Sequence, residues 1–180
     1  YFQGKKELFE GLAMEKLEKE WTKHPILHFD LNISHYDAPD SLYKILNDTL
    51  SRYEEEYGTR PTEETLPLRF AGIIDRAYRK TGQRAAILID EYDKPLLQNL
   101  HDEEMQNRFR NMLKPFYGVL KTMDRAIRFA LLTGVTKFGK VSVFSDLNNL
   151  DDISMREPYA AICGITETEL RTHFDEDIHT

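Results

Sequence analysis

The chain has 180 residues, of which 41% are hydrophobic and 31% are charged, and its formal net charge is −7. This balance predicts one globular domain with its own core, and it excludes a protein that is drawn to nucleic acid by its overall charge. No apolar run approaches the roughly 18 residues that a membrane span needs, so no membrane partner is expected. Cys163 is the single cysteine, which excludes an internal disulfide framework and favours a reducing cytoplasm.

The amino-terminal region is expected to be helical. Residues 1–4, Tyr-Phe-Gln-Gly, resemble the remnant of a cleaved purification tag, so the domain is expected to comprise residues 5–180. Leucines recur among many Glu and Lys between residues 5 and 23, which favours a helix, and Pro25 ends this region.

The next segments predict one strand and two helices. Residues 26–32 alternate apolar and polar side chains, which indicates a strand with one wet side near the edge of a sheet. A helical stripe then runs from Pro39 to Gly58, and a second helix covers 64–81 and stops at Gly82.

The second half of the chain alternates strands and helices. Residues 85–89 are apolar without alternation, which favours a central strand over 85–91 that is covered on both faces. A helical stretch follows to about residue 122, and Pro115 is expected to kink or split it. The remaining predicted elements are strands near 126–133 and 159–165 and a final helix opened by the capping box Thr166-x-x-Glu169.

This order predicts an α/β fold, because connections of this length allow right-handed crossovers between parallel strands. The expected sheet contains strands near 26–32, 85–91, 126–133 and 159–165, flanked by helices. In such sheets, ligands bind beyond the carboxyl ends of the strands.

Two carboxylates stand at the end of the predicted central strand. Asp90 and Glu91 follow the apolar run, which is where a nucleoside triphosphatase places its Walker B pair. Asp90 would hold Mg²⁺, and Glu91 would orient and polarise the attacking water as a general base. A buried strand that merely emerges into the acidic turn Asp90–Asp93 would have the same sequence.

The neighbouring strand ends on a hydroxyl. Thr133 terminates the apolar run 126–133, and in triphosphatases a polar residue at this point contacts the γ-phosphate or the water. Thr133 therefore fits a sensor role in both nucleotide binding and catalysis. A threonine that simply breaks a strand into a loop is an equally frequent explanation.

A near-match to a phosphate-binding loop lies just beyond this strand. Gly134 and the pair Gly139-Lys140 fit the pattern G-x-x-x-x-G-K, but Val141 stands where Ser or Thr should follow. The residues after Lys140 are β-prone, whereas a phosphate loop opens a helix at its lysine. The match also comes after the Walker B candidate instead of before it. We interpret it as a coincidence, and no other G-x-x-x-x-G-K occurs in the chain.

Several separated blocks resemble the bacterial AAA-ATPase-like family, in family order. They are GKKELFEGL, PILHFDLN, AAILIDEYDKPLL, LLTGVTKFGKVSVFSDLNNLDDIS and YAAICGITETEL. The resemblance covers essentially residues 5–180. It implies a partial P-loop NTPase-like sheet, with ATP and Mg²⁺ as cofactors of the full-length protein.

The same resemblance implies that parts of the family pattern are missing. This chain begins where the phosphate-loop helix would be ending, so it is expected to be a fragment that carries the Walker B and sensor half and is inactive by itself. It also stops before the PD-(D/E)XK-type nuclease-like domain that commonly follows in the family. Such a domain is therefore an expected partner in the full-length protein.

Other chemistry finds little support in the residues. No Lys has Asp or Glu two positions before it, as the nuclease core needs, and no paired cysteine suggests a protein-held metal. Basic residues between 108 and 128 would suit nucleic acid, although a solvated helix surface explains them more simply.

Two functions remain open from the sequence. The first is part of an ATP-binding and hydrolysing module. The second is a non-enzymatic interaction or scaffold domain with a degenerate NTPase fold, in which Asp90 and Glu91 are structural caps. In either case the absent phosphate-loop strand would leave the edge of strand 126–133 unpaired, so a homodimer through this edge is a further candidate partner.

Overall fold

The computed structural model describes residues 1–136, 142–144, 147–162 and 165–178. The chain divides into two units, residues 1–148 and 149–180. The first unit contains the sheet and its helices, and the second contains the carboxyl-terminal helix.

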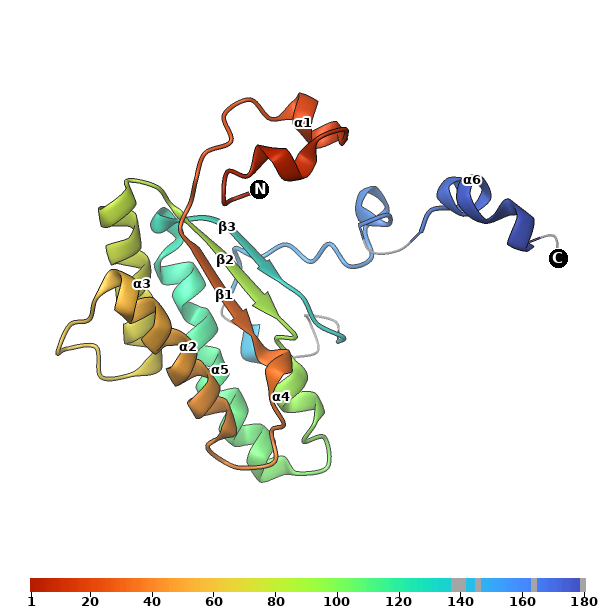
Figure 1. The fold of residues 1–180 in the computed structure, drawn as a ribbon. Helices are drawn as coiled ribbons and strands as arrows, with labels where there is room; N and C mark the ends of the chain where they lie inside the picture. Colours follow the sequence, from red (N-terminus) through yellow and green to blue (C-terminus); the bar gives the residue numbers. More distant parts are fainter. Residues whose placement is uncertain (137–141, 145–146, 163–164, 179–180) are drawn as a thin grey trace. The chain divides into compact units, whose positions relative to one another are not determined.

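The sheet has three parallel strands in the order β1-β2-β3 (Figure 1). The strands are β1 (Ile26–Asp30), β2 (Ala85–Asp90) and β3 (Ile127–Leu132). Their register places Asp30 opposite Asp90, so the carboxyl ends of the strands meet at one edge. This confirms the expected α/β fold and the adjacency of the first three predicted strands.

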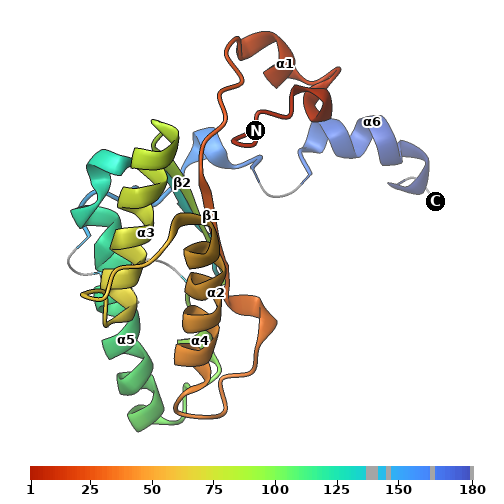
Figure 2. The ribbon, with the colours of Figure 1, turned by 60° about the vertical axis from the view of Figure 1, so that its left-hand side comes forward.

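Three helices cover one face of the sheet (Figures 1 and 2). They are α2 (Ser41–Tyr57), α3 (Leu66–Thr81) and α5 (Glu103–Thr122). The buried rings of Phe29, Phe70 and Phe116 lie together between these helices and the strands, with centroids 4.7–5.3 Å apart. Gly58 and Gly82 end the first two helices with positive φ angles, as the sequence predicted.

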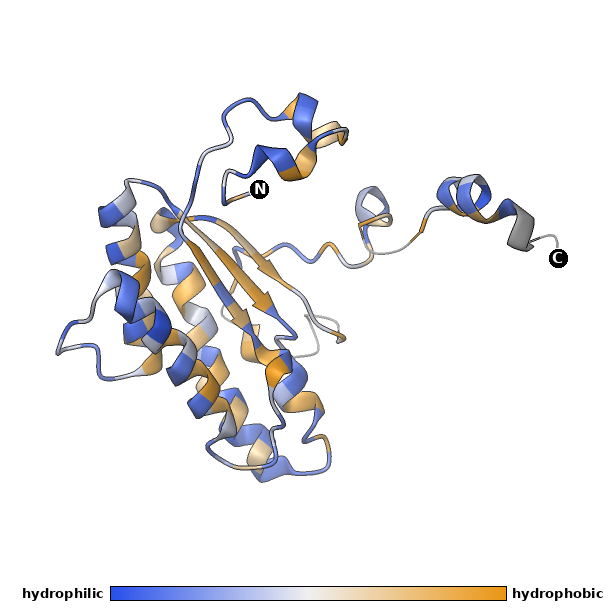
Figure 3. Ribbon diagram, in the orientation of Figure 1, coloured by the Kyte–Doolittle hydropathy of each residue, from blue (hydrophilic) through white to orange (hydrophobic). Residues whose placement is uncertain are grey.

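The opposite face of the sheet is only partly covered. The register places His28, Leu88 and Leu131 side by side on this face. Leu131 is 40% exposed and Phe129 41% exposed, although all three strands are strongly hydrophobic (Figure 3). The exposure is concentrated on β3, because α2, α3 and α5 all pack on the other side. The expectation that β2 is covered on both faces holds for most of the strand, since on this face Ala86 is completely buried and Leu88 is half-buried.

The predicted fourth strand is absent from the described part of 159–165. Glu157–Tyr159 is a 3-10 helix and residues 160–162 form a turn, while residues 163–164 lie outside the described residues. Pro158 in the first turn favours the helical start. A run such as Tyr-Ala-Ala-Ile adopts a strand only if a neighbouring strand supplies hydrogen bonds, and the sequence does not reveal that neighbour.

The carboxyl-terminal unit contains α6 (Glu167–Ile178). Its predicted capping box is confirmed. The Thr166 hydroxyl accepts a hydrogen bond from the Glu169 backbone N–H at 3.2 Å, and Oε2 of Glu169 accepts one from the Thr166 backbone N–H at 2.9 Å.

Two helix predictions need correction. Residues 5–23 form only the 3-10 helix Lys6–Phe9 and the short α1 (Ala13–Leu17), because Gly11 turns the chain at a φ of 79° and neither piece buries a residue. Pro115 does not split α5, which stays continuous. Pro115 lies on its exposed side, and the buried Phe116 and Tyr117 hold the helix against the core.

Among the described residues, no helix is both long enough and apolar enough to cross a membrane.

Candidate functional site

Asp90 and Thr133 meet at the carboxyl edge of the sheet. Asp90 ends β2 and Thr133 directly follows β3, and both side chains are exposed. The Thr133 hydroxyl donates a hydrogen bond to Oδ1 of Asp90. The Thr133 backbone is fixed as well, because its N–H donates to the Ile89 carbonyl at 2.9 Å and its carbonyl accepts from the Tyr92 N–H at 3.0 Å.

Glu91 occupies a strained backbone position. Its φ is 54°, in the left-handed region that residues other than glycine rarely adopt, and this conformation costs about 1–2 kcal/mol. The residue is half-buried. Such strain persists only where surrounding contacts impose it, and it is concentrated at functional sites.

Asp93 is a site residue that reasoning from the sequence did not single out. Its side chain is completely buried. Its Oδ2 accepts hydrogen bonds from the N–H of Thr136 at 2.6 Å and from the Thr136 hydroxyl, and its Oδ1 accepts one from the N–H of Val135 at 3.3 Å. The acidic turn was visible in the sequence, but nothing there marked this carboxylate as buried.

Two tyrosines reinforce the same contact. The Tyr92 hydroxyl donates to the carbonyl of Thr136, and the buried Tyr117 hydroxyl donates to the carbonyl of Tyr92 at 2.9 Å. Burial raises the pKa of Tyr117 well above its ordinary value, and the nearby charge of Asp93 adds to this effect. Tyr117 therefore remains a hydrogen-bond donor at physiological pH.

Gly134 lies where these groups leave no space. A Cβ atom at this position would lie 2.6 Å from Oδ1 of Asp93 and 2.6 Å from Cε1 of Tyr92. Gly134 was noted in the sequence as the start of a near-match to a phosphate loop. Of that match, residues 137–141 lie outside the described residues, and Gly134 to Thr136 form the turn that Asp93 binds.

The β1 side of the edge is also polar. Oδ1 of Asp30 accepts from the Asn32 N–H at 2.8 Å, and the Lys94 ammonium, at the start of the short α4 (Lys94–Leu97), donates to the Asn32 carbonyl at 2.8 Å. Within the described ranges, no three or more His, Cys, Asp and Glu side chains form a group that could hold a metal ion.

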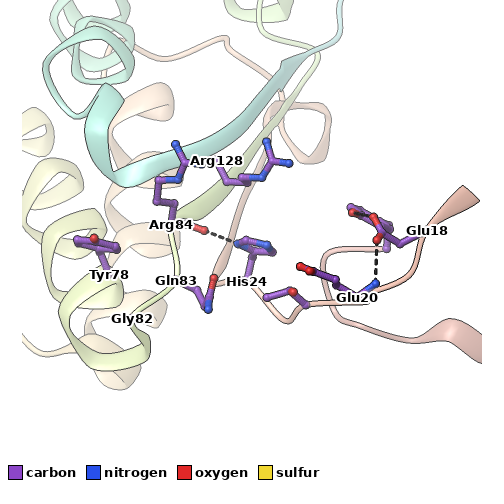
Figure 4. A pocket seen from close by; sticks show the side chains of 10 residues that line it. Glu18, Glu20, His24, Tyr78, Gly82, Gln83, Arg84 and Arg128 are labelled. Atoms are coloured by element: carbon purple, nitrogen blue, oxygen red, sulfur yellow. Dashed lines mark hydrogen bonds between the residues drawn. The ribbon is translucent and has the colours of Figure 1, made fainter.

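A surface pocket of about 460 Å³ lies at the other end of the strands (Figure 4). His24 precedes β1, Arg84 precedes β2 and Arg128 belongs to β3, so the pocket opens at the amino ends of the strands. Nδ1 of His24 lies 2.8 Å from the Arg84 carbonyl. This pocket contains none of the predicted site residues.

Comparison with known proteins shows the family of the chain. The model of a family described as predicted AAA-ATPase matches residues 1–144. The chain belongs to this family. The match begins at Tyr1 and so includes the four residues that resembled a tag remnant.

The chain is also similar to a curated protein. It is described as an uncharacterized protein in the vnfD 5′ region of Azotobacter chroococcum mcd 1, and it is 38% identical over 178 residues. The alignment covers 98% of this chain but 34% of the relative, so the chain spans about a third of that protein. No solved structure matches the chain.

Proposed function

We propose that this chain supplies the Walker B and sensor residues of an ATP-binding and ATP-hydrolysing module. One observation carries the proposal. Asp90 and Thr133, from adjacent strands, are hydrogen-bonded at the carboxyl edge of the sheet, where ligands of α/β proteins bind. Membership of the predicted AAA-ATPase family supports the same conclusion.

Each residue has a distinct role in this proposal. Asp90 holds Mg²⁺, Glu91 orients the attacking water and takes its proton, and Thr133 contacts the γ-phosphate or the water. An exposed carboxylate and a hydroxyl fit Mg²⁺, which prefers oxygen ligands. Mg²⁺ bound to a nucleotide needs only one or two protein carboxylates, which accords with the lack of a larger acidic group among the described residues. When bound, the ion would neutralise charge on the phosphate oxygens.

The phosphate loop would come from a strand that pairs with the free edge of β3. The outer edge of β1 is already engaged, because the Tyr53 hydroxyl accepts from the His28 N–H at 2.6 Å and donates to the His28 carbonyl at 3.2 Å. Among the described strands, β3 pairs only with β2. An added strand would therefore join β3 and bring its phosphate loop beside Thr133.

The rest of the proposal concerns the complete natural protein. Its phosphate loop would complete the module, and this chain without that loop would be inactive. A nuclease-like carboxyl-terminal domain is the proposed partner within the protein, and the cytoplasm is the proposed location.

The test uses the complete natural protein that contains this chain. Asp90→Asn should weaken Mg²⁺-dependent nucleotide binding, whereas Glu91→Gln should keep binding and lower turnover roughly 10²–10⁴-fold, the usual effect of removing a general base. Glu104→Gln, an exposed acid on α5, is the matched control. ATP affinity and phosphate release are measured separately.

The outcomes separate the proposal from a scaffold role. If Glu91→Gln hydrolyses ATP at the parent rate, Glu91 is not the base. If the parent protein neither binds nor hydrolyses ATP, and the substitutions change only stability, by about 1 kcal/mol for a lost turn or cap, the chain is a scaffold domain.

A further inference from the structure

We propose that Asp93 is a positioning residue, which holds Thr133 and Glu91 in their working geometry by tying the loop after β3 to the turn after β2. This inference rests on the proposed function of Asp90, Glu91 and Thr133. Asp93 itself is buried, and its side-chain hydrogen bonds to described residues join it to Val135 and Thr136 and not to the proposed reacting groups. It acts through the two segments that it joins.

The hydrogen bonds of Asp93 are made to the loop after β3 and not to its own helix. Asp93 occupies the N-cap position of α4, where an aspartate commonly caps the first turn, yet its side chain makes no capping hydrogen bond. Within the part of the chain that the structure describes, its side-chain hydrogen bonds come instead from Val135 and Thr136. A purely local role in starting α4 does not explain this arrangement.

The chemistry of the contact favours a carboxylate. Its partners among the described residues are two backbone N–H groups and one hydroxyl, and all of them donate to the two oxygens of Asp93. An asparagine has only one acceptor oxygen, so its amide NH₂ would face a donor. A buried donor without an acceptor is destabilising, and the loop would move to relieve it.

A further hydrogen bond joins the turn after β2 to the loop after β3. The Tyr92 hydroxyl donates to the Thr136 carbonyl, and Gly134 lies against both Tyr92 and Asp93 with no space for a side chain. Thr136 is thus held through its N–H, its hydroxyl and its carbonyl. The loop after β3 cannot shift without breaking several bonds together.

Two sets of hydrogen bonds hold the segments that contain Thr133 and Glu91. On the strand side, the Tyr92 N–H donates to the Thr133 carbonyl. On the loop side, Asp93 binds Thr136, three residues beyond Thr133. Releasing Asp93 therefore frees the loop that follows Thr133 and the turn that keeps Glu91 in its left-handed conformation. Displacements of about 1 Å at a catalytic group can cost roughly a hundredfold in rate.

The test compares variants of the complete natural protein. We expect Asp93→Asn to lower kcat about 10- to 100-fold while KM for ATP stays within about twofold. Thr136→Val removes the hydroxyl donor and leaves both backbone bonds, so its effect should be smaller. Phe70→Leu, which weakens the core away from this edge, is the control for loss of stability.

Hydrogen exchange supplies a readout that does not depend on turnover. Asp93→Asn and Thr136→Val should increase amide exchange at residues 133–136, and Phe70→Leu should not. If Asp93→Asn and a Phe70→Leu control of the same stability lose kcat equally, the positioning role is overturned. Unchanged amide exchange at residues 133–136 in Asp93→Asn would overturn it as well. If Asp93→Asn does not fold, Thr136→Val decides by the same two measurements.

Failure of the proposed function gives a different pattern. In that case the parent protein shows no ATP hydrolysis, while the exchange data still report whether Asp93 holds the loop. A parent that hydrolyses ATP, with neither variant differing from the Phe70 control, overturns the inference and leaves the proposed function standing.

Discussion

Gly134 shows how little space the candidate site allows at the scale of single residues. We expect Gly134→Ala to lower the free energy of unfolding by about 1–3 kcal/mol, because its Cβ would overlap Asp93 and Tyr92. Gly118 is the matched control, since a Cβ there meets nothing within 4 Å. Gly118→Ala, inside α5, should stabilise the protein by about 0.4–1 kcal/mol. Urea denaturation of both variants measures the difference, and equal values would contradict the close packing at Gly134.

The site residues themselves were partly predictable. The adjacency of Asp90 and Thr133 followed from two apolar runs, because parallel strands bring their carboxyl ends to the same edge. The burial of Asp93 was not predictable, because it depends on which loop folds over the turn. The left-handed conformation of Glu91 could not be predicted either. Glycine or asparagine usually occupies such a position, and a glutamate gives no indication of it.

At the scale of elements, the two edges of the sheet differ. Tyr53 hydrogen-bonds the outer edge of β1, whereas β3 ends the described sheet with Phe129 and Leu131 exposed. An apolar edge of this kind pairs with other chains. We therefore expect the 180-residue chain to self-associate at micromolar concentrations or above, and Leu131→Lys to shift it toward monomer.

Sedimentation velocity over a range of concentrations tests this expectation. Leu68→Lys is the control, because Leu68 is 51% exposed on α3, away from the sheet edge. A parent chain that remains monomeric at every concentration, or equal effects of the two substitutions, would argue against pairing through β3.

For the whole molecule, the expected behaviour is weak nucleotide binding by this chain alone. A phosphate loop supplies several charge-assisted hydrogen bonds of roughly 1.5–3 kcal/mol each. Losing three or four of them removes about 5–10 kcal/mol, comparable to the ~8 kcal/mol of micromolar binding. Titration calorimetry with Mg-ATP should detect no micromolar binding to the chain, while the complete protein serves as the positive control. A micromolar dissociation constant for the chain would show that it binds nucleotide by another route.

The sequence by itself determined the features that depend on neighbouring residues. Hydrophobic runs located β1, β2 and β3, glycines marked the ends of α2 and α3, and Thr166 and Glu169 predicted their own capping box. In each case the interactions that stabilise the feature involve residues close together in the sequence, so the local sequence pattern is enough to predict it.

The tertiary structure decided the features that depend on partners distant in the sequence. Residues 5–23 formed only short helices because neither helix buries a residue. The described part of 159–165 formed no strand, since no described strand pairs with it. Three helices packing on one side left Leu131 exposed. Likewise, Asp93 became a buried acceptor only because the loop after β3 places its donors there. Burial and hydrogen-bond satisfaction are properties of the assembled fold, and a local sequence pattern cannot specify which distant group will supply them.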